Sequence, residues 1–348
     1  MLLRRKKYQR VCMICTVYSL FEYLLYSSVE EINNTFFVFE NWMWKDFGDK
    51  FKNAYCMSER GFSMSRNTAW LYFKYIKWFK LPNYRHSELF TLDHLPHHTV
   101  FIGYHKYTLL EDGPHCHSVM LKNNVPYSVY EEKKYEHLPT FKKRMAHRLR
   151  KLVYGPVYYN RWGKSYLCTD LILSTDDDLY YFKNKTIHRI KLDDIWSTFS
   201  SQKQELMLKV FDLNEENVEL LMSKKIIILT QPLFPDYISE QEHSDIWRRI
   251  ISKYPIEEVL VKPHPRDFYL YENDFEDLSV FRKKMPSQFF EVLGLEFHKA
   301  VTTFTSAVFG LNVQEIDWYG TEVSETIHDR IGSKPFMPDG MVVNHCKL

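Results

Sequence analysis

Short apolar runs alternate with helical patterns through the second half of the chain, and this alternation restricts the fold most strongly. Lys225–Thr230 has the composition of a buried strand, and Glu240–Tyr254 places its apolar residues on one helical face. Further strands are expected at Glu257–Val261, Lys299–Phe304 and Glu315–Trp318, and further helices at Ser287–Leu295 and Ser306–Val313. Strand–helix–strand alternation predicts a parallel sheet covered by helices on both faces.

The first half contains weaker strand signals, and its N-terminus resembles a signal peptide. Strands are expected at Val11–Cys15, Thr35–Phe39, Thr99–Gly103 and Tyr107–Leu110. Basic residues precede an apolar stretch at 11–25, but Glu22 interrupts that stretch and no small-residue cleavage site follows. We therefore expect a buried strand that enters a helix at Thr16–Ser27. A targeting or anchoring role of the basic N-terminus stays open as the alternative.

A chain of 348 residues is long enough for two hydrophobic cores. The two alternating halves predict an α/β protein with two Rossmann-like domains, whose parallel sheets face a central cleft. We expect a first domain at 1–218, a second domain at 219–320, and a tail at 321–348 that packs back toward the first domain.

Glycine is scarce, with 11 residues, and the sequence holds neither G-x-G-x-x-G nor a P-loop motif. A bound nucleotide would therefore be held by side chains and helix N-termini. The six cysteines are widely spread. Cys12 and Cys15 imitate a C-x-x-C motif, but no second pair accompanies them, and we interpret both as buried thiols.

The formal net charge of +2 conceals a basic stretch without acidic residues between His137 and Thr169. Its helical pattern at 141–152 places Phe141, Met145, Leu149 and Leu152 on one apolar stripe surrounded by Lys and Arg. This pattern fits a solvated surface helix, or a helix that contacts anionic headgroups or a charged glycan. Nucleic acid is not expected as a partner, because no recognisable binding module accompanies the charge.

Three short motifs combine the groups that acid–base chemistry on a phosphate ester needs. The first is Glu111-Asp112-Gly113, where a strand ends in two carboxylates and Gly113 favours a sharp turn. A carboxylate at such a strand end can take the proton of an attacking hydroxyl. Taken alone, this motif is also typical of an ordinary turn.

The second motif follows the strand at Glu257–Val261, and prolines on both sides hold its histidine in a stiff turn. His264 can donate a hydrogen bond or a proton to a phosphate oxygen. Lys262 and Arg266 add positive charge, and Pro265 restricts the backbone. The alternative is a structural turn with a surface histidine.

The third motif, Thr305-Ser306, begins a predicted helix. Hydroxyls at a helix N-terminus are common caps, and the same position can bind phosphate. A helix that contains Glu291 separates this motif from the second one. Asp176–Asp178 imitate a metal-binding D-x-D motif, but we interpret them as a turn before a strand.

The order of these motifs resembles bacterial sialyltransferases of glycosyltransferase families 38, 52 and 80, which share D/E-D-G, then H-P, then S/T-S. Lys225–Thr230 and the segment Pro286–Glu291 also resemble family 52 and the polysialyltransferases. The length and the Lys262–Arg266 context favour family 52, the lipooligosaccharide and capsule type.

The resemblance implies a GT-B fold, in which the domain at 1–218 is the acceptor side and the domain at 219–320 binds the CMP-sugar. It also implies CMP-sialic acid as donor, and inversion at the anomeric carbon without a metal or other cofactor. It implies Asp112 as general base, His264 as the group that assists departure of CMP, Thr305 and Ser306 at the phosphate, Glu291 at the ribose, and Lys262 near the cytidine. The acceptor would be a galactose-containing lipooligosaccharide, O-antigen or capsule. The implied location is the cytoplasm, with peripheral contact to the inner face of the bacterial cytoplasmic membrane.

Two alternatives of other classes stay open. One is another CMP-releasing transferase, such as a CDP-glycerol glycerophosphotransferase, since these enzymes also carry an H-P motif beside a phosphate. The other is a non-enzymatic, membrane-peripheral assembly protein that uses the basic helix.

Overall fold

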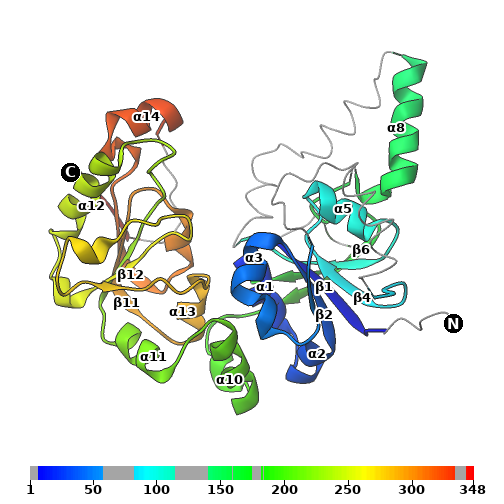
Figure 1. The fold of residues 1–348 in the computed structure, drawn as a ribbon, viewed down its shortest axis with the longest axis horizontal. Coiled ribbons are helices and arrows are strands. Elements are labelled where there is room, and N and C mark those ends of the chain that lie inside the picture. The colour runs from blue at the N-terminus through cyan, green and yellow to red at the C-terminus, as the bar shows by residue number, and fades with distance from the viewer. Residues whose placement is uncertain are drawn as a thin grey trace. The chain divides into compact units, whose positions relative to one another are not determined.

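The computed structural model describes residues 7–57, 82–113, 140–158, 160–174, 182, 184–333 and 342–348. The chain divides into two compact units, Met1–Lys191 and Leu192–Leu348. We call them unit 1 and unit 2. The division falls before the boundary expected at 218, so that α10 (Ser201–Val210) and α11 (Glu215–Met222) belong to unit 2 (Figure 1).

Unit 1 is built on a parallel sheet of seven strands in the order β3-β2-β1-β4-β5-β6-β7. The strands are β1 (Arg10–Ile14), β2 (Thr35–Phe39), β3 (Ala54–Cys56), β4 (Glu88–Thr91), β5 (Tyr107–Leu109), β6 (Cys168–Leu173) and β7 (Thr186–Arg189). Every residue of β2 and nearly every residue of β1 is buried, as in a sheet covered on both faces. The expected first strand is confirmed.

Helices connect the strands of unit 1, and the first two of them begin with side-chain caps. In the described part of unit 1 the helices are α1 (Val17–Tyr26), α2 (Val29–Asn34), α3 (Asn41–Phe47), α5 (Pro96–Ile102) and α8 (Phe141–Tyr154). Thr16 caps α1 in a reciprocal box with Ser19, which confirms the helix expected after the first strand. Helix α8 extends away from the sheet of unit 1 (Figure 1).

Unit 2 is built on a second parallel sheet, of six strands in the order β10-β9-β8-β11-β12-β13. The strands are β8 (Ile226–Leu229), β9 (Val259–Lys262), β10 (Ser279–Val280), β11 (Phe297–Thr302), β12 (Val313–Trp318) and β13 (Val342–His345). Its helices include α12 (Glu240–Ile251), α13 (Gln288–Val292) and α14 (Glu325–Ile331), together with the 3₁₀ helix η7 (Ser306–Gly310). The predicted α/β class with two parallel sheets is confirmed.

One expectation from the sequence is wrong. Thr99–Gly103 was expected as a strand but lies in α5 and its C-cap, because Pro96 occupies the first turn of a helix whose other residues are all buried. A fully buried helix lacks the polar stripe that distinguishes it from a strand in the sequence. The packing of the tail at 321–348 toward the first domain stays a prediction. Within unit 2, β13 pairs with β12, and Ile327 and Leu348 contribute to the core.

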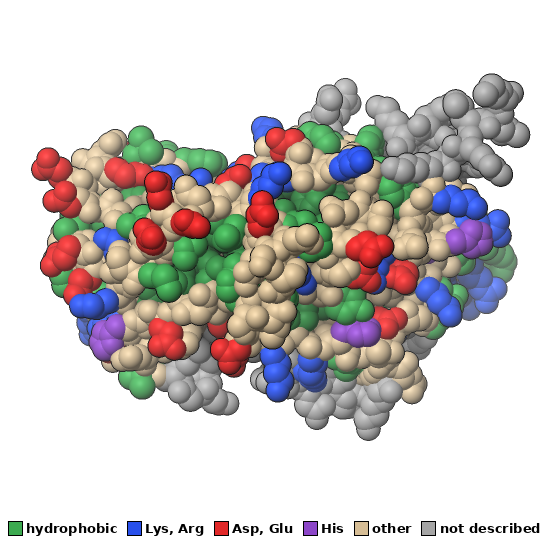
Figure 2. Space-filling view, turned by 90° about the horizontal axis from the view of Figure 1, so that it is seen from below, with side chains coloured by type: hydrophobic (Ala, Val, Ile, Leu, Met, Phe, Trp, Pro, Cys, Tyr) green, Lys and Arg blue, Asp and Glu red, His purple; other side chains and the backbone are tan. Residues whose placement is uncertain are grey.

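Charged side chains of both signs are interspersed over the face drawn in Figure 2, as expected for a small net charge. Within the described residues, no helix has the length and apolar character needed to cross a membrane.

Candidate active site

The candidate nucleotide residues of unit 2 lie at one edge of its sheet. Strands β9, β8 and β11 are parallel neighbours, so their carboxyl ends meet at the same edge. His264 follows β9, Thr230 follows β8, and Thr305 follows β11. Strands two positions apart in a sheet are separated by about 10 Å. The structure thus brings the second and third motifs within the span of a nucleotide phosphate and its neighbouring groups.

Backbone hydrogen bonds fix both the position and the tautomer of His264. Its own backbone N–H donates to Thr230 Oγ1 at 3.2 Å, and the backbone N–H of Arg266 donates to His264 Nδ1 at 3.1 Å. Because Nδ1 accepts a hydrogen bond, the proton of the neutral ring is on Nε2. Burial, together with the positive charges of Arg266 and Lys262, lowers the pKa of His264. At neutral pH the half-buried ring therefore offers an N–H donor rather than a full positive charge.

A buried hydrogen-bond network, which the sequence analysis missed, supports the turn that carries His264. Asp267 is buried, and its Oδ2 accepts hydrogen bonds from the hydroxyls of Thr230 and, at 2.6 Å, Tyr271. His243 Nε2 lies 3.1 Å from the Tyr271 hydroxyl and 3.6 Å from Asp267 Oδ1. The network connects β8, α12 and the His-Pro turn, so it positions His264. Asp267 directly follows Arg266, but its inward direction could not be inferred from the sequence.

Lys262 is the buried cation of this edge. Its Nζ donates to the backbone carbonyl of Lys283 at 3.1 Å and lies 5.5 Å from the ring centroid of Phe281. Burial lowers the pKa of Lys262 to about 8. Pro265 and Arg266 are exposed, and the Arg266 guanidinium is 3.8 Å from the Asp236 carboxylate.

The Thr305-Ser306 turn is joined to the segment that carries Glu291. Thr305 is buried and caps η7, since its Oγ1 accepts from the backbone N–H of Ala307 at 3.3 Å. The hydroxyl of Ser287 donates to the carbonyl of Ala307 at 3.1 Å. The expected helix is thus a five-residue 3₁₀ turn in contact with the residue that precedes α13. The side chain of Ser306 is outside the described part.

Glu291 has an unusual environment for a carboxylate. Burial, followed by the neighbouring Asp193 carboxylate, raises the pKa of Glu291 to about 7. The side chain is half-buried on the short helix α13. A shift of this size is frequent at functional sites, where a ligand supplies the missing compensation.

The raised pKa of Glu291 predicts a specific pH dependence of stability. The folded chain retains a proton that the unfolded chain, with a carboxyl pKa near 4.5, has already lost, so stability falls as the pH rises from 4.5 to about 7. Glu291→Gln removes this decline. We expect the variant to melt a few degrees higher than the wild type at pH 8 and at the same temperature at pH 4.5.

Thermal melts followed by circular dichroism measure this difference. Glu276→Gln, at an exposed carboxylate of the same unit, is the control and should leave the pH profile unchanged. If the melting temperatures of Glu291→Gln and the wild type changed by the same amount between pH 4.5 and 8, the assigned pKa would be contradicted.

In unit 1, Glu111 and Asp112 have different environments although they are adjacent. Glu111 is fully buried, and its Oε2 accepts from the backbone N–H of Ser174 at 2.8 Å and from the Ser174 hydroxyl at 2.9 Å. The backbone N–H of Glu111 donates to Glu22 Oε2 at 2.7 Å. Glu111 therefore connects the carboxyl ends of β5 and β6 with α1 and supports the turn.

Asp112 is the exposed carboxylate of the pair, with 36% of its side chain accessible. His94 Nε2 lies 3.6 Å from Asp112 Oδ2, and the His94 ring stacks on Trp162 with centroids 4.4 Å apart. Among the described residues, no heavy atom lies within 4 Å of a Cβ added to Gly113, and its φ is not in the left-handed region. The conformational reason expected for glycine at this position is thus absent.

Asp93 organises the surroundings of His94, and the sequence analysis missed both residues. Asp93 accepts from the backbone N–H groups of Trp162 and Gly163, each at 2.7 Å, and Oδ2 also accepts from the Tyr107 hydroxyl at 2.7 Å. Trp162 has a φ of 58°, a conformation that these bonds stabilise. The sequence did contain a signal for Asp93 and His94, because polar residues follow the short apolar run of β4. We missed it because we had not predicted that strand. The D-x-D imitation at 176–178 lies outside the described residues.

The carboxyl-end placement of these residues on two parallel sheets is that of nucleotide-dependent α/β enzymes. The model of glycosyltransferase family 52 matches residues 35–326, and the protein therefore belongs to this family. A curated relative is an uncharacterised protein of Haemophilus influenzae, 24% identical over 242 residues, or 69% of this chain and 71% of the relative.

Solved structures of sialyltransferases have the same fold. A sialyltransferase from Photobacterium damsela aligns with a TM-score of 0.55 at 14% identity, covering 89% of this chain and 74% of that one. The GT-B domain of a sialyltransferase from Photobacterium damselae aligns with a TM-score of 0.56 at 14% identity, covering 88% and 90%. The GT-B fold expected from the sequence is confirmed.

Proposed function

We propose that the protein transfers sialic acid from CMP-sialic acid to a hydroxyl of a galactose-containing glycan on the bacterial surface, with inversion and without a metal or other cofactor. The single observation that carries the proposal is the tautomer of His264, which directs an N–H donor from a stiff turn beside a buried lysine. Membership of glycosyltransferase family 52 supports it, as does the fold shared with sialyltransferases.

The proposed reaction is a single displacement at the anomeric carbon. The acceptor oxygen forms a bond to that carbon while the bond to the CMP phosphate breaks, and Asp112 takes the acceptor proton. The departing phosphate gains negative charge, which the Nε2–H of His264 stabilises by hydrogen bonding. CMP is a good leaving group and the transition state resembles an oxocarbenium ion, so that charge stabilisation and exclusion of water are the main requirements.

Unit 2 would hold the nucleotide in this proposal. Thr305 and Ser306 bind the phosphate, Glu291 accepts from the ribose hydroxyls, and Lys262 lies near the cytidine. Pro265 keeps the turn stiff, and Arg266 adds positive charge. Unit 1 supplies Asp112, with Glu111 and Gly113 in its supporting turn.

Donor turnover separates this proposal from its main alternative, a CDP-glycerol glycerophosphotransferase. Both reactions release CMP, so CMP release is measured with CMP-sialic acid and with CDP-glycerol at equal concentration. We expect turnover of CMP-sialic acid alone. Turnover of CDP-glycerol alone would favour the alternative, and turnover of neither, with or without acceptor glycans, would favour a non-enzymatic assembly role.

We further propose that α8 contacts an anionic membrane surface, which would keep the enzyme beside a glycolipid acceptor on the inner face of the cytoplasmic membrane. Phe141, Leu149 and Leu152 on this helix have exposed fractions of 69%, 54% and 68%. Arg144, Arg148, Arg150 and Lys151 are exposed on the same helix. An apolar stripe beside basic side chains is typical of helices that lie in the membrane interface.

Charge reversal on α8 should abolish vesicle binding. The triple variant Arg144→Glu, Arg148→Glu and Lys151→Glu should bind phosphatidylglycerol vesicles at least about 100-fold more weakly, since each basic residue contributes about 1 kcal/mol. Co-sedimentation with vesicles measures this. The control reverses three exposed charges elsewhere, Lys45→Glu, Lys209→Glu and Arg249→Glu. Equal loss in both triple variants would contradict a role specific to α8.

A further inference from the structure

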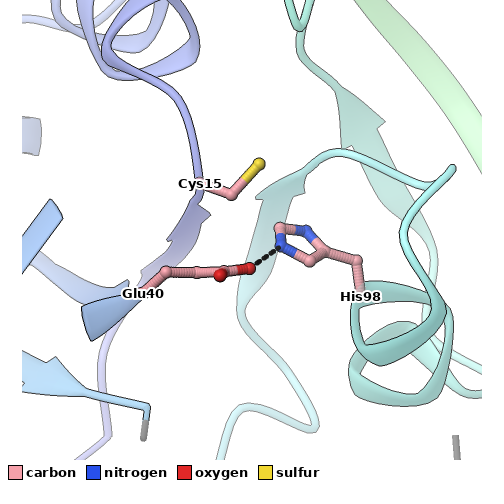
Figure 3. Close-up of side chains that lie close together, drawn as sticks. All are labelled: Cys15, Glu40 and His98. Atoms are coloured by element: carbon pink, nitrogen blue, oxygen red, sulfur yellow. Dashed lines mark ion pairs between the residues drawn. The ribbon is translucent and has the colours of Figure 1, made fainter. Parts of the chain in front are cut away.

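Three buried side chains of unit 1 converge at the carboxyl ends of its strands, apart from the groups used above. Cys15 directly follows β1, Glu40 directly follows β2, and His98 lies on α5. Their exposed fractions are 2%, 3% and 0%. Figure 3 shows the three side chains pointing toward one another, and their ligand atoms all lie within 4.8 Å of each other.

The Nδ1 of His98 has a hydrogen-bond partner, and the Nε2 faces the other two groups. Thr91 Oγ1 lies 2.8 Å from His98 Nδ1 and can accept from it while the Thr91 hydroxyl donates to the Leu92 carbonyl at 3.1 Å. This arrangement places the proton of the neutral ring on Nδ1 and leaves Nε2 as the ligand atom. Among the described residues, the buried Nε2 atom has no hydrogen-bond partner, and its contact with Glu40 Oε1 at 3.6 Å is longer than a hydrogen bond.

The three groups offer their ligand atoms to one buried space. Glu40 Oε1 and His98 Nε2 lie 3.6 Å apart, and the Cys15 Sγ lies within 4.8 Å of both ligand atoms. A cation bound between these atoms would compensate for their burial.

We propose that Cys15, Glu40 and His98 bind a zinc ion through Sγ, a carboxylate oxygen and Nε2. Zinc takes thiolate, imidazole and carboxylate ligands, and bond lengths near 2 Å in a tetrahedron place a nitrogen and an oxygen ligand about 3.3 Å apart. The Glu40–His98 separation of 3.6 Å is close to this value. The thiolate ligand disfavours magnesium and calcium, which prefer oxygen.

Two of the three proposed ligands, His98 and Glu40, already have the orienting contacts that metal sites require. Thr91 fixes the His98 ring from Nδ1, and His97 Nε2 contacts Glu40 Oε1. Such outer contacts set the direction of a ligand and are typical of histidine and carboxylate ligands. Binding of zinc would release the Cys15 proton, and one thiolate with one carboxylate would neutralise the ion. A water molecule would complete the tetrahedron.

The consequence for unit 1 is a crosslink between two strand ends and α5, on the same edge of the sheet as Asp112. Because the trio is buried, the ion would be acquired as unit 1 folds. The proposed transfer reaction does not pass through this ion, so the two proposals can fail independently.

Metal content of the purified full-length chain tests the proposal. The chain is expressed with zinc supplied, dialysed against metal-free buffer, and analysed by inductively coupled plasma mass spectrometry. We expect about one zinc per chain, lost in Cys15→Ser and in Glu40→Gln. The control is Cys12→Ser, which removes a buried thiol of β1 and should retain the ion.

Cobalt provides a readout of the ligands themselves. Chain produced with cobalt in place of zinc should show a thiolate-to-cobalt charge-transfer band that disappears in Cys15→Ser and persists in Cys12→Ser. If Cys15→Ser does not fold, the nearly isosteric Glu40→Gln gives the same comparison by zinc content. Zinc well below one per chain in the folded wild type, or zinc content independent of both Cys15 and Glu40, would overturn the proposal.

Discussion

Asp112→Asn is expected to lower kcat for sialyl transfer about 10²- to 10⁴-fold, the range of a positioned general base. Asparagine keeps the size of the side chain but cannot take the acceptor proton. Asp112 is suited to this role because its carboxylate is accessible, whereas the carboxylate of Glu111 is fully buried against Ser174. The substitution removes the charge of Asp112 but keeps the side chain next to His94, so the fold should remain.

The measurement is steady-state transfer with a saturating donor, with circular dichroism as the test of folding. Asp49→Asn, at an exposed carboxylate of the same unit, is the control and should keep the wild-type rate. The KM for the acceptor should change little, since the proton transfer belongs to the transition state. A folded Asp112→Asn enzyme with the wild-type kcat would exclude Asp112 as the base.

His264→Ala is expected to lower kcat about 10²- to 10³-fold, as removal of one donor from developing negative charge does elsewhere. Alanine removes the Nε2–H donor and leaves the backbone N–H of Arg266 without its Nδ1 acceptor. His264→Gln should recover part of the rate, because its amide can again donate to the phosphate. This rescue distinguishes loss of the donor from loss of the turn.

The same assay with His345→Ala, at an exposed histidine of unit 2, is the control. Equal rates for the wild type, His264→Ala and His264→Gln would contradict the proposed role.

The lowered pKa of His264 also sets a direction for the stability of the wild type. Its free energy of unfolding falls as the pH falls below the ordinary histidine value, since the unfolded chain binds the proton more readily.

The sequence located the carboxyl-end motifs because their signals are local. A strand of four or five apolar residues, followed by His264 between two prolines, can be recognised from the sequence without any tertiary information. The same holds for β8, β9 and β11, which formed within two residues of the expected starts. Parallel pairing then brought His264 and Thr305 to one edge, as the alternation of strands and helices implied.

Contacts between distant segments were outside the reach of the sequence. Asp267 fixes the His264 turn only because Thr230 and Tyr271 converge on it, and His94 meets Asp112 only because β4 and β5 are neighbours. Cys15, Glu40 and His98 are far apart in the chain, so no spacing rule for metal ligands could find them. Cys15 had been interpreted only as a buried thiol, which the structure confirms.

The most direct test of the central claim is transfer itself. The purified chain is incubated with CMP-sialic acid and a set of galactosides, and the products are analysed by mass spectrometry and by NMR of the new linkage. The account predicts a sialylated galactoside with inverted anomeric configuration, formed in the presence of a metal chelator and lost in Asp112→Asn. A folded enzyme that releases no CMP and forms no sialoside with any acceptor, while it turns over another CMP-linked donor, would contradict it.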